Sequence, residues 1–193
     1  MPLIKISPRN QPKQERSFRT RREILQATAR LLNRHDEPEV STNHIAKATG
    51  ISIGTLYKHY PNKDAILSDL IDLYMESDLK GIQEVLSVAN KSPEQTAELF
   101  LGWVIDTHKT QHKLRAVLYS NLGRLLKNPR AVQTRAKIGE RIMNSPIGNL
   151  LESPHRMLMT VAAINAMIHV VSQLPSSEED WESLKKVALR ILR

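Results

Sequence analysis

At 193 residues the chain is long enough for one or two domains, and its 40% apolar and 25% charged residues exclude an intrinsically disordered polypeptide. Because it has no cysteine, disulfides, zinc–thiolate sites, iron–sulfur clusters and cysteine nucleophiles are excluded, and we expect a reducing, cytoplasmic location. Residues 1–64 carry 12 Lys or Arg against 6 Asp or Glu, so most of the net charge of +8 lies in the first third, as in segments that bind a polyanion.

The first residues of the chain are strongly basic. Residues 1–22 hold seven Lys or Arg and a single acid, Glu15. Pro2, Pro8 and Pro12 disfavour an early helix, so we expect residues 1–16 to form a flexible basic arm. Such an arm either contacts nucleic acid or serves only for solubility, and its composition does not choose between the two.

Helical periodicity then recurs along the whole chain. No hairpin turn joins two alternating segments, so the expected fold is all-α with about nine helices. The first helix is predicted over 17–34, where apolar residues return every three or four positions. Two short helices follow near 42–49 and over about 53–60, with Ser41 and Ser52 as their expected N-caps.

The two short helices, separated by a tight turn at Gly50, are typical of a helix-turn-helix. The residues expected to pack inward are Ile45, Ala46, Ile51 and Leu56, and Tyr60 is expected to cap this small core. The outward face of the second helix would present Thr55, Tyr57, Lys58 and His59, which can reach phosphates and base edges in a major groove. Gly54 removes a side chain at the start of that helix, where a DNA backbone or base would come closest.

The remainder of the chain continues the helical pattern. Asn62 is the expected N-cap of a long amphipathic helix, and residues 92–95 predict a capping box for the next. The later helices are predicted over about 112–127, over 128–151 with an interruption at 145–146, over 154–174, and from a capping box at 176–179 to about Leu192. The uncharged segment 157–177 contains polar residues, which favours a buried helix over a membrane span, and no signal-peptide core is apparent.

Residues 45–67 read IAKATGISIGTLYKHYPNKDAIL, and this string resembles the TetR family of bacterial transcriptional regulators. Positions of the first helix between Arg22 and Leu32 also match, so the resemblance covers about residues 20–67. The rest of the chain is similar to the family only in length and helical character. The resemblance implies a DNA-binding domain over 17–64 and a helical effector-binding and dimerisation domain over 65–193.

The resemblance also implies DNA contacts. Thr42, Tyr57, His59 and Lys63 would touch phosphates, Asn43 would read a base, Gly54 and Thr55 would face the groove, and Lys58 would reach a base or a phosphate. Two positions depart from the family pattern. An acidic loop at 35–39 stands where the family commonly has glycine, and Ile53 stands where a member carries a polar reader, which leaves the operator sequence open.

The helices after residue 92 hold Met and aromatic residues that are typical either of a core or of an effector pocket. The resemblance makes Phe100, Trp103, Tyr119, Met143 and Met167 candidates for that pocket. Asn165, His169 and Gln173 recur every four residues and fit a pocket, a dimer interface or an exposed edge equally well. His108 and His112 have a helical ligand spacing but no evident third ligand, so we expect no metal site and no cofactor.

Function follows from two-fold geometry, because one short helix reads too few bases for useful specificity. A homodimer through the last two helices, at 164–171 and 184–192, would place two such helices one turn of double-stranded DNA apart, and a small-molecule effector would change their spacing. Repression is the usual mode of the family. Two other classes remain: an all-α enzyme, for which no catalytic constellation is apparent, and a DNA-coating protein of the nucleoid without sequence preference. We therefore expect a regulator, not an enzyme and not a membrane protein.

Overall fold

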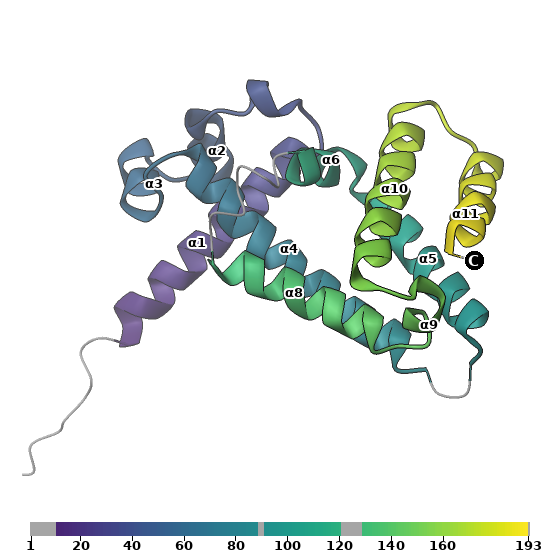
Figure 1. Cartoon of the computed structure of the whole chain (residues 1–193). Helices are drawn as coiled ribbons and strands as arrows, with labels where there is room; N and C mark the ends of the chain where they lie inside the picture. The colour runs from purple at the N-terminus through teal and green to yellow at the C-terminus, as the bar shows by residue number, and fades with distance from the viewer. Residues whose placement is uncertain (1–10, 89–90, 121–128, 193) are drawn as a thin grey trace, which may run out of the picture. The chain divides into compact units, whose positions relative to one another are not determined.

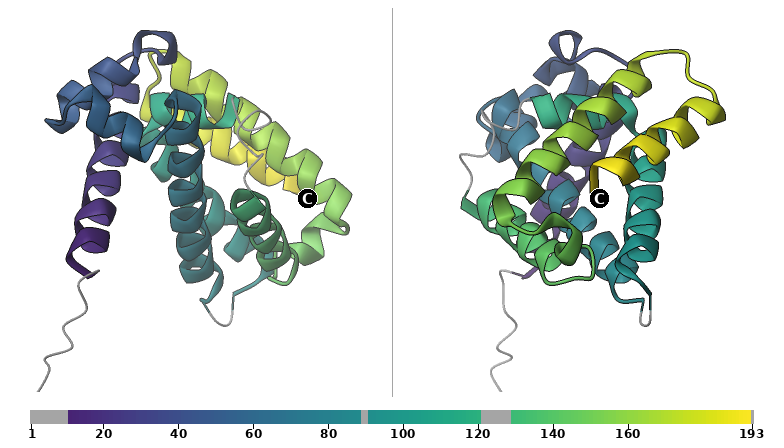
Figure 2. Two further views of the ribbon diagram at one scale, coloured as in Figure 1. Left: turned by 90° about the vertical axis from the view of Figure 1, so that its left-hand side faces the viewer. Right: turned by 45° about the vertical axis from the view of Figure 1, so that its right-hand side comes forward.

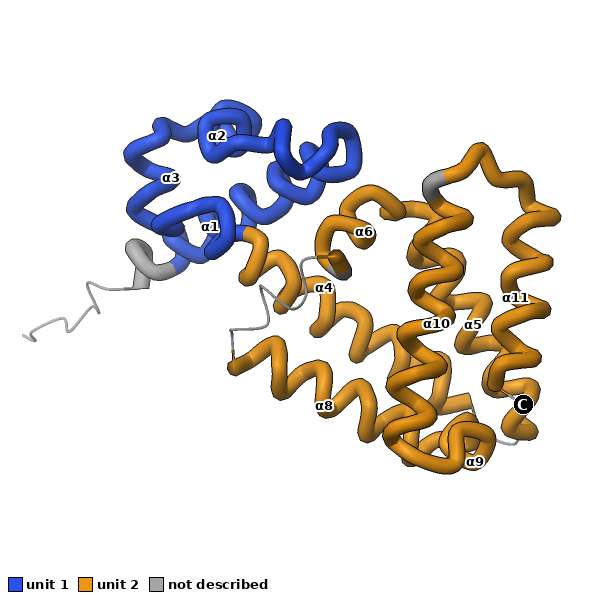
Figure 3. The backbone as a smooth tube through the Cα atoms, turned by 45° about the horizontal axis from the view of Figure 1, so that its top comes forward, with its two compact units in different colours: residues 1–66 blue, residues 67–193 orange. Residues whose placement is uncertain are grey.

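The computed structural model describes residues 11–88, 91–120 and 129–192. Within these ranges the chain forms ten α-helices, one 3-10 helix and no strand, which confirms the all-α expectation (Figure 1). Two compact units are present, Met1–Ile66 and Leu67–Arg193 (Figure 3). Helix α4, Lys63–Leu86, begins in the first unit and continues into the second.

The first unit contains α1 (Gln11–Leu32), the 3-10 helix η1 (Glu37–Glu39), α2 (Thr42–Thr49) and α3 (Ile53–His59). Its core consists of apolar side chains contributed by every α-helix of the unit. The buried members include Ile24, Ala27, Leu32, Val40, Ile45, Ala46, Leu56, Tyr60 and Ile66. The predicted burial of Ile45, Ala46, Leu56 and Tyr60 is confirmed, whereas Ile51 is half-buried.

Helix α1 begins earlier than the sequence predicted. It starts at Gln11, so the expected flexible arm over 1–16 is wrong for residues 11–16, and residues 1–10 lie outside the described part. Pro12 is the second residue of the helix. In a first turn the missing amide of proline has no intrahelical acceptor to lose, so proline does not exclude a helix that starts just before it.

Local hydrogen bonds fix the ends of the helices around the turn. The hydroxyl of Ser41 accepts from the amide of His44 at 3.2 Å, and that of Ser52 accepts from the amide of Thr55 at 3.1 Å. Gly50 ends α2 with a φ of +74°, a left-handed conformation in which a side chain is strained. Asn62 accepts from the amide of Ala65 at 2.9 Å. All of these predicted boundaries are confirmed.

The second unit contains the rest of α4 and six further described helices (Figure 2). They are α5 (Pro93–Thr110), α6 (His112–Ser120), α8 (Pro129–Met143), α9 (Gly148–Leu151), α10 (Pro154–Gln173) and α11 (Glu178–Leu192). The predicted helix 112–127 is described only to Ser120, and the predicted interruption at 145–146 separates α8 from α9. No helix in the described part is long and apolar enough to cross a membrane.

Two predicted capping boxes have different outcomes. At α5 the amide of Gln95 donates to the Ser92 hydroxyl and the Gln95 side chain accepts from the Ser92 amide, as predicted. At α11 the prediction placed the box one residue too early. Ser177 exchanges the equivalent hydrogen bonds with Asp180, because its hydroxyl and the Asp180 carboxylate are three residues apart. Helix α11 still ends at Leu192 as expected.

The core of the second unit lies where α5, α10 and α11 pack together, and α10 and α11 lie side by side (Figures 1 and 2). Its buried members include Leu101, Ile105, Ile164, Ile168, Trp181, Leu184 and Leu192. One face of α10 is therefore buried against its neighbours, through Ile164 and Ile168, while Leu158, Met159 and Val170 remain exposed.

Candidate nucleic-acid interface and internal cavity

The buried side chains of α2 and α3 hold the two helices against each other and leave one face of each outside. Leu56 on α3 and Ile45 on α2 have no exposed surface. With those residues pointing inward, Tyr57 is 50% exposed and Lys58 is also exposed. The helical spacing of residues therefore determines which side chains α3 offers to a partner.

The predicted DNA contacts are all at least partly accessible in the first unit. Asn43, Gly54, Tyr57 and Lys58 are exposed, and Thr42, Thr55, His59 and Lys63 are half-exposed. The hydroxyls of Thr42 and Tyr57 lie 3.1 Å apart and connect α2 to α3. The hydroxyls of Ser52 and Thr55 lie 2.8 Å apart at the start of α3. The fold thus brings predicted contact residues of α2 and α3 together.

Gly54 lies in open space at the start of α3. A Cβ atom added at this position would have Ser52 Oγ as its nearest neighbour, at 4.0 Å. No packing within the chain therefore requires glycine here. The bare backbone leaves room for an external partner to approach α3 closely.

Lys63 has a partner that the sequence did not reveal. Its ammonium lies 2.6 Å from a carboxylate oxygen of Glu37 and donates to the Glu37 carbonyl at 3.1 Å. The side chains of Lys63 and Glu37 are 25% and 22% exposed, so water screens the pair only in part. The acidic loop 35–39 thus neutralises one of the charges that was expected to meet phosphate.

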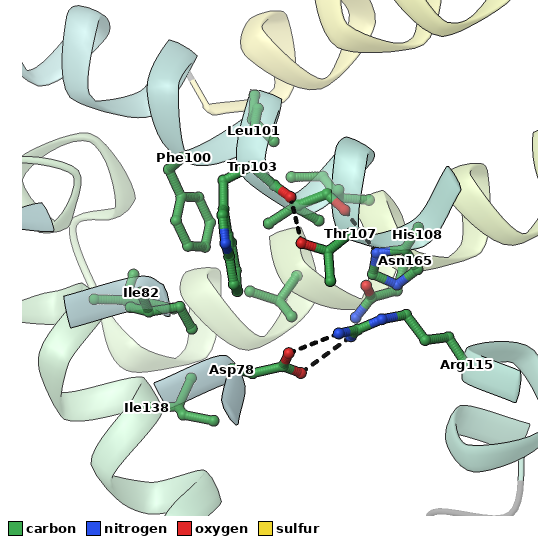
Figure 4. A pocket seen from close by; sticks show the side chains of 14 residues that line it. Asp78, Ile82, Phe100, Leu101, Trp103, Thr107, His108, Arg115, Ile138 and Asn165 are labelled. Carbon is green, nitrogen blue, oxygen red and sulfur yellow. Dashed lines mark hydrogen bonds and ion pairs between the residues drawn. The ribbon is translucent and has the colours of Figure 1, made fainter. Parts of the chain in front are cut away.

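The second unit contains a cavity of about 110 Å³ that is partly open to solvent (Figure 4). One end is apolar, with Phe100 and Trp103 of α5 facing side chains such as Ile82 and Ile138. The two aromatic rings are tilted by 30° with centroids 6.2 Å apart. A Cβ at Gly81 would lie 2.5 Å from the Trp103 indole, so only glycine lets the indole pack directly against α4.

The other end of the cavity is polar (Figure 4). Arg115 of α6 donates two hydrogen bonds to the Asp78 carboxylate of α4, at 2.8 and 3.1 Å. The guanidinium also lies 5.8 Å from the centre of the Tyr74 ring. Thr107 donates to the carbonyl of Trp103 at 2.7 Å, and Asn165 of α10 completes this end.

His108 is buried beside the ion pair. Its Nδ1 lies 2.8 Å from the carbonyl of Val104, and because a carbonyl only accepts, Nδ1 carries the proton in this contact. Burial lowers the pKa of His108, and the nearby Arg115 charge acts in the same direction, against the opposing effects of the Val104 carbonyl and Asp78. The imidazole is therefore neutral at pH 7.

The lowered pKa of His108 predicts a loss of stability in mild acid. The unfolded chain takes up the proton near the usual pKa of about 6.5, while the folded chain resists it. Stability is therefore complete above that pH and falls as the pH decreases from about 6.5 towards the folded-state pKa. The measurement is the melting temperature between about pH 7.5 and 5.0. His108→Gln should flatten this dependence, and an unchanged slope would contradict the assignment.

The five side chains predicted for an effector pocket do not share one place. Phe100 and Trp103 line the cavity, whereas Met143 and Met167 pack against the core and are not among its lining residues. The side chain of Tyr119 lies outside the described part. Sequence reasoning missed Asp78, Arg115 and Thr107, since no local pattern connects an acid on α4 to a base on α6.

The three polar residues that recur on α10, Asn165, His169 and Gln173, do not share one environment. Asn165 lies on the wall of the first cavity and also on that of a second cavity of about 220 Å³, where His108, His112 and His169 are found. In the described ranges no group of three or more His, Cys, Asp or Glu side chains is placed to hold a metal ion. The side chain of Gln173 is outside those ranges.

An apolar groove runs between the outer faces of α10 and α11. It is lined chiefly by Ala166, Met167, Val170, Val171, Leu184 and Val187. Val170 is 59% exposed and Val187 is 44% exposed, so the groove keeps large apolar side chains in water. Surfaces of this kind are typical of sites where another protein surface binds.

Comparison with known proteins finds one family. Residues 24–70 match the family described as bacterial regulatory proteins, tetR family. The nucleoid occlusion factor SlmA of Sodalis glossinidius is 30% identical over 131 residues, which are 67% of this chain and 56% of that protein. The chain thus spans little more than half the length of this curated relative.

Solved structures share the fold at low sequence identity. A TetR transcriptional regulator from Rhodococcus sp. RHA1 superposes with a TM-score of 0.65 at 17% identity, covering 91% of this chain and 96% of that one. FadR of Thermus thermophilus, a TetR family transcriptional repressor in complex with lauroyl-CoA, gives a TM-score of 0.61 at 20% identity, covering 89% and 92%.

Proposed function

The chain belongs to the tetR family of bacterial regulatory proteins, and from this premise we propose that it is a repressor that binds a palindromic operator as a homodimer and is released by a small-molecule effector. The observation that carries the proposal is the exposed face of α3 beside buried Leu56 and Tyr60. In this role α3 enters the major groove, while residues of α2 and the start of α4 hold the phosphates.

Particular contacts support this arrangement. The bare backbone at Gly54 allows α3 to approach the duplex, and the paired hydroxyls of Thr42 and Tyr57 reach one phosphate together. Lys58 adds an exposed positive charge on the same helix. Lys63 has to leave Glu37 before it can bind a phosphate, so its contribution to affinity is smaller than that of Lys58.

The groove between α10 and α11 supports the proposed dimer. Its exposed valines, Val170 and Val187, are covered when the same groove of a second subunit packs against it. The two DNA-binding units of such a dimer (residues 1–66 of each subunit, here called the heads) can contact successive major grooves on one face of the duplex. The dimer then gains affinity because the second head binds in an intramolecular step.

The cavity of the second unit supports the proposed effector. Asp78 and Ile82 on its wall belong to α4, the helix whose first residue is Lys63. A ligand that fits the cavity better in one position of α4 shifts the protein towards that state and changes the spacing of the heads. The lauroyl-CoA bound by Thermus FadR supports a ligand-binding role for this fold.

A second candidate function is an action at the nucleoid. It is favoured by the 30% identical relative, which is a nucleoid occlusion factor. The two functions differ in the consequence of DNA binding. A repressor changes the transcription of genes beside its sites, whereas a nucleoid-acting protein leaves transcription unchanged when it is deleted.

The DNA-binding face is tested with a duplex selected by the purified protein from a random pool. Lys58→Ala should weaken binding and lower the slope of log affinity against log salt by about one, because one phosphate contact is lost. The measurement is fluorescence anisotropy over a series of salt concentrations. It applies to either candidate function, since both require α3 to bind DNA.

Lys80 provides the matched control. It is an exposed lysine on the part of α4 that belongs to the second unit, so Lys80→Ala removes the same charge away from the proposed face. This variant should keep the wild-type salt slope. Equal slopes for Lys58→Ala and the wild type would contradict groove docking by α3.

A further inference from the structure

The size of the cavity limits what it can hold. Its volume is about 110 Å³. An engineered apolar cavity of about 150 Å³ in another protein holds benzene, so this smaller cavity holds at most about one six-membered ring. Phe100 and Trp103 offer flat surfaces against which such a ring can stack.

The charges on the wall already neutralise each other. In the described part of the chain Asp78 and Arg115 are the charged residues that line the cavity, and they form a bidentate pair at 2.8 and 3.1 Å. His108, with its lowered pKa, adds no charge at pH 7. A charged ligand group beside this pair would therefore lack a counter-charge or would have to break the pair, and both are costly there because the two side chains are only 6% and 14% exposed.

Hydrogen-bonding capacity nevertheless remains at the polar end. Within the described residues the side-chain amide of Asn165 makes no hydrogen bond, and it offers both donors and an acceptor to the cavity. The Thr107 hydroxyl donates its proton to Trp103 and keeps its acceptor lone pairs. One polar group on a ligand is thus enough to use the capacity at this end.

We propose that the effector is an uncharged compound of one ring with a single hydroxyl or carbonyl group, its ring against Phe100 and Trp103 and its polar group at Asn165. The proposal rests on the proposed function, because it gives the chemical class of the effector expected there. It excludes ring acids, ring amines and long acyl chains as ligands of this cavity.

The charge requirement is tested on the full chain by calorimetric titration with phenol, benzyl alcohol, benzoate and benzylammonium. Phenol and benzyl alcohol should bind with an affinity at least about tenfold higher than that of the two charged compounds, since burying an unpaired charge is unfavourable. Decanol tests the size limit and should not compete with phenol. Benzoate or benzylammonium binding as tightly as phenol would overturn the proposal, and so would competition by decanol.

The location is tested by filling the cavity. Val161 lines it on α10, so Val161→Phe should abolish phenol binding. Val132 on α8 is 49% exposed, so Val132→Phe is a matched control that should bind phenol like the wild type. Unchanged phenol affinity in a folded Val161→Phe protein would place the ligand elsewhere. If Val161→Phe does not fold, the comparison of neutral and charged ligands still decides the class.

The ligand class and the regulatory role can fail separately. Anisotropy on the selected duplex is repeated with saturating phenol. If phenol binds and DNA affinity does not change, the proposed ligand class is supported and the proposed release from DNA by an effector is contradicted. If the protein binds the duplex and no neutral ring compound binds the protein, the proposed ligand class is contradicted and the proposed DNA-binding role is supported.

Discussion

Arg115→Met should lower the free energy of unfolding by about 3–5 kcal/mol, measured by chemical denaturation. The Arg115 and Asp78 side chains are only 6% and 14% exposed. Removing the guanidinium leaves the Asp78 carboxylate buried without its bidentate partner, and it also removes the cation beside the Tyr74 ring. The expected loss is therefore a cost of an unpaired charge rather than the value of one hydrogen bond.

Two further variants separate these contributions. In Asp78→Leu/Arg115→Met no unpaired charge remains on the wall of the cavity, so much of the lost stability should return. Arg130 forms an ion pair with Glu76 at 2.7 Å, but the two side chains are 69% and 40% exposed. Arg130→Met should therefore cost no more than about 1 kcal/mol. If Arg115→Met is no more destabilising than Arg130→Met, the pair at the cavity has no special role in stability.

Val170→Glu should convert a dimer into a monomer and lower affinity for the full selected duplex by about 100-fold or more. Val170 is exposed in the groove between α10 and α11, where a glutamate from each subunit would bring like charges into an apolar contact. Sedimentation at micromolar concentration measures the subunit state, and anisotropy measures the affinity. Binding to a duplex with one half-site should change little.

The same substitution elsewhere serves as the control. Val132→Glu also places a carboxylate at an exposed valine, on α8, and should remain dimeric with wild-type affinity. A wild-type protein that is monomeric at micromolar concentration would contradict the proposed dimer. So would a Val170→Glu protein that remains dimeric and keeps its affinity.

These predictions depend in different degrees on sequence and on tertiary structure. The helix-turn-helix followed from the sequence, because its signals are local. Ser41 and Ser52 cap amides three residues away, and Gly50 ends α2 through its own φ. The inward residues follow from the helical period alone, which is why Ile45 and Leu56 were found in the core as predicted.

The expected DNA-contact residues were assigned from the outward face of the second short helix and from a resemblance, and the structure shows what surrounds each of them. It leaves Lys58 exposed and shows open space at Gly54, both compatible with a bound duplex. It also pairs Lys63 with Glu37, 26 residues away in the chain. The acidic loop was visible in the sequence, but its partner was not, because charge composition does not give distances between side chains.

Helices α10 and α11 also show what the sequence leaves undetermined. The sequence identified α10 and α11 as apolar, yet it did not show which face of each helix is buried and which is exposed. Ile164 and Ile168 are buried in the core, whereas Val170 lies exposed in the groove. Helical spacing puts Val170 on a different face from Ile164 and Ile168, but only the positions of the neighbouring helices decide which face remains for a partner.

By itself the sequence determined the helical class, the ends of the helices around the turn and the turn at Gly50, because each depends on interactions within about one turn of the chain. Only the tertiary structure decided that Asp78 and Arg115 meet at one cavity and that Phe100 and Trp103 line it while Met143 does not. Those facts depend on how separate helices pack. Packing is set by the fit of many side chains at once, which no short segment encodes.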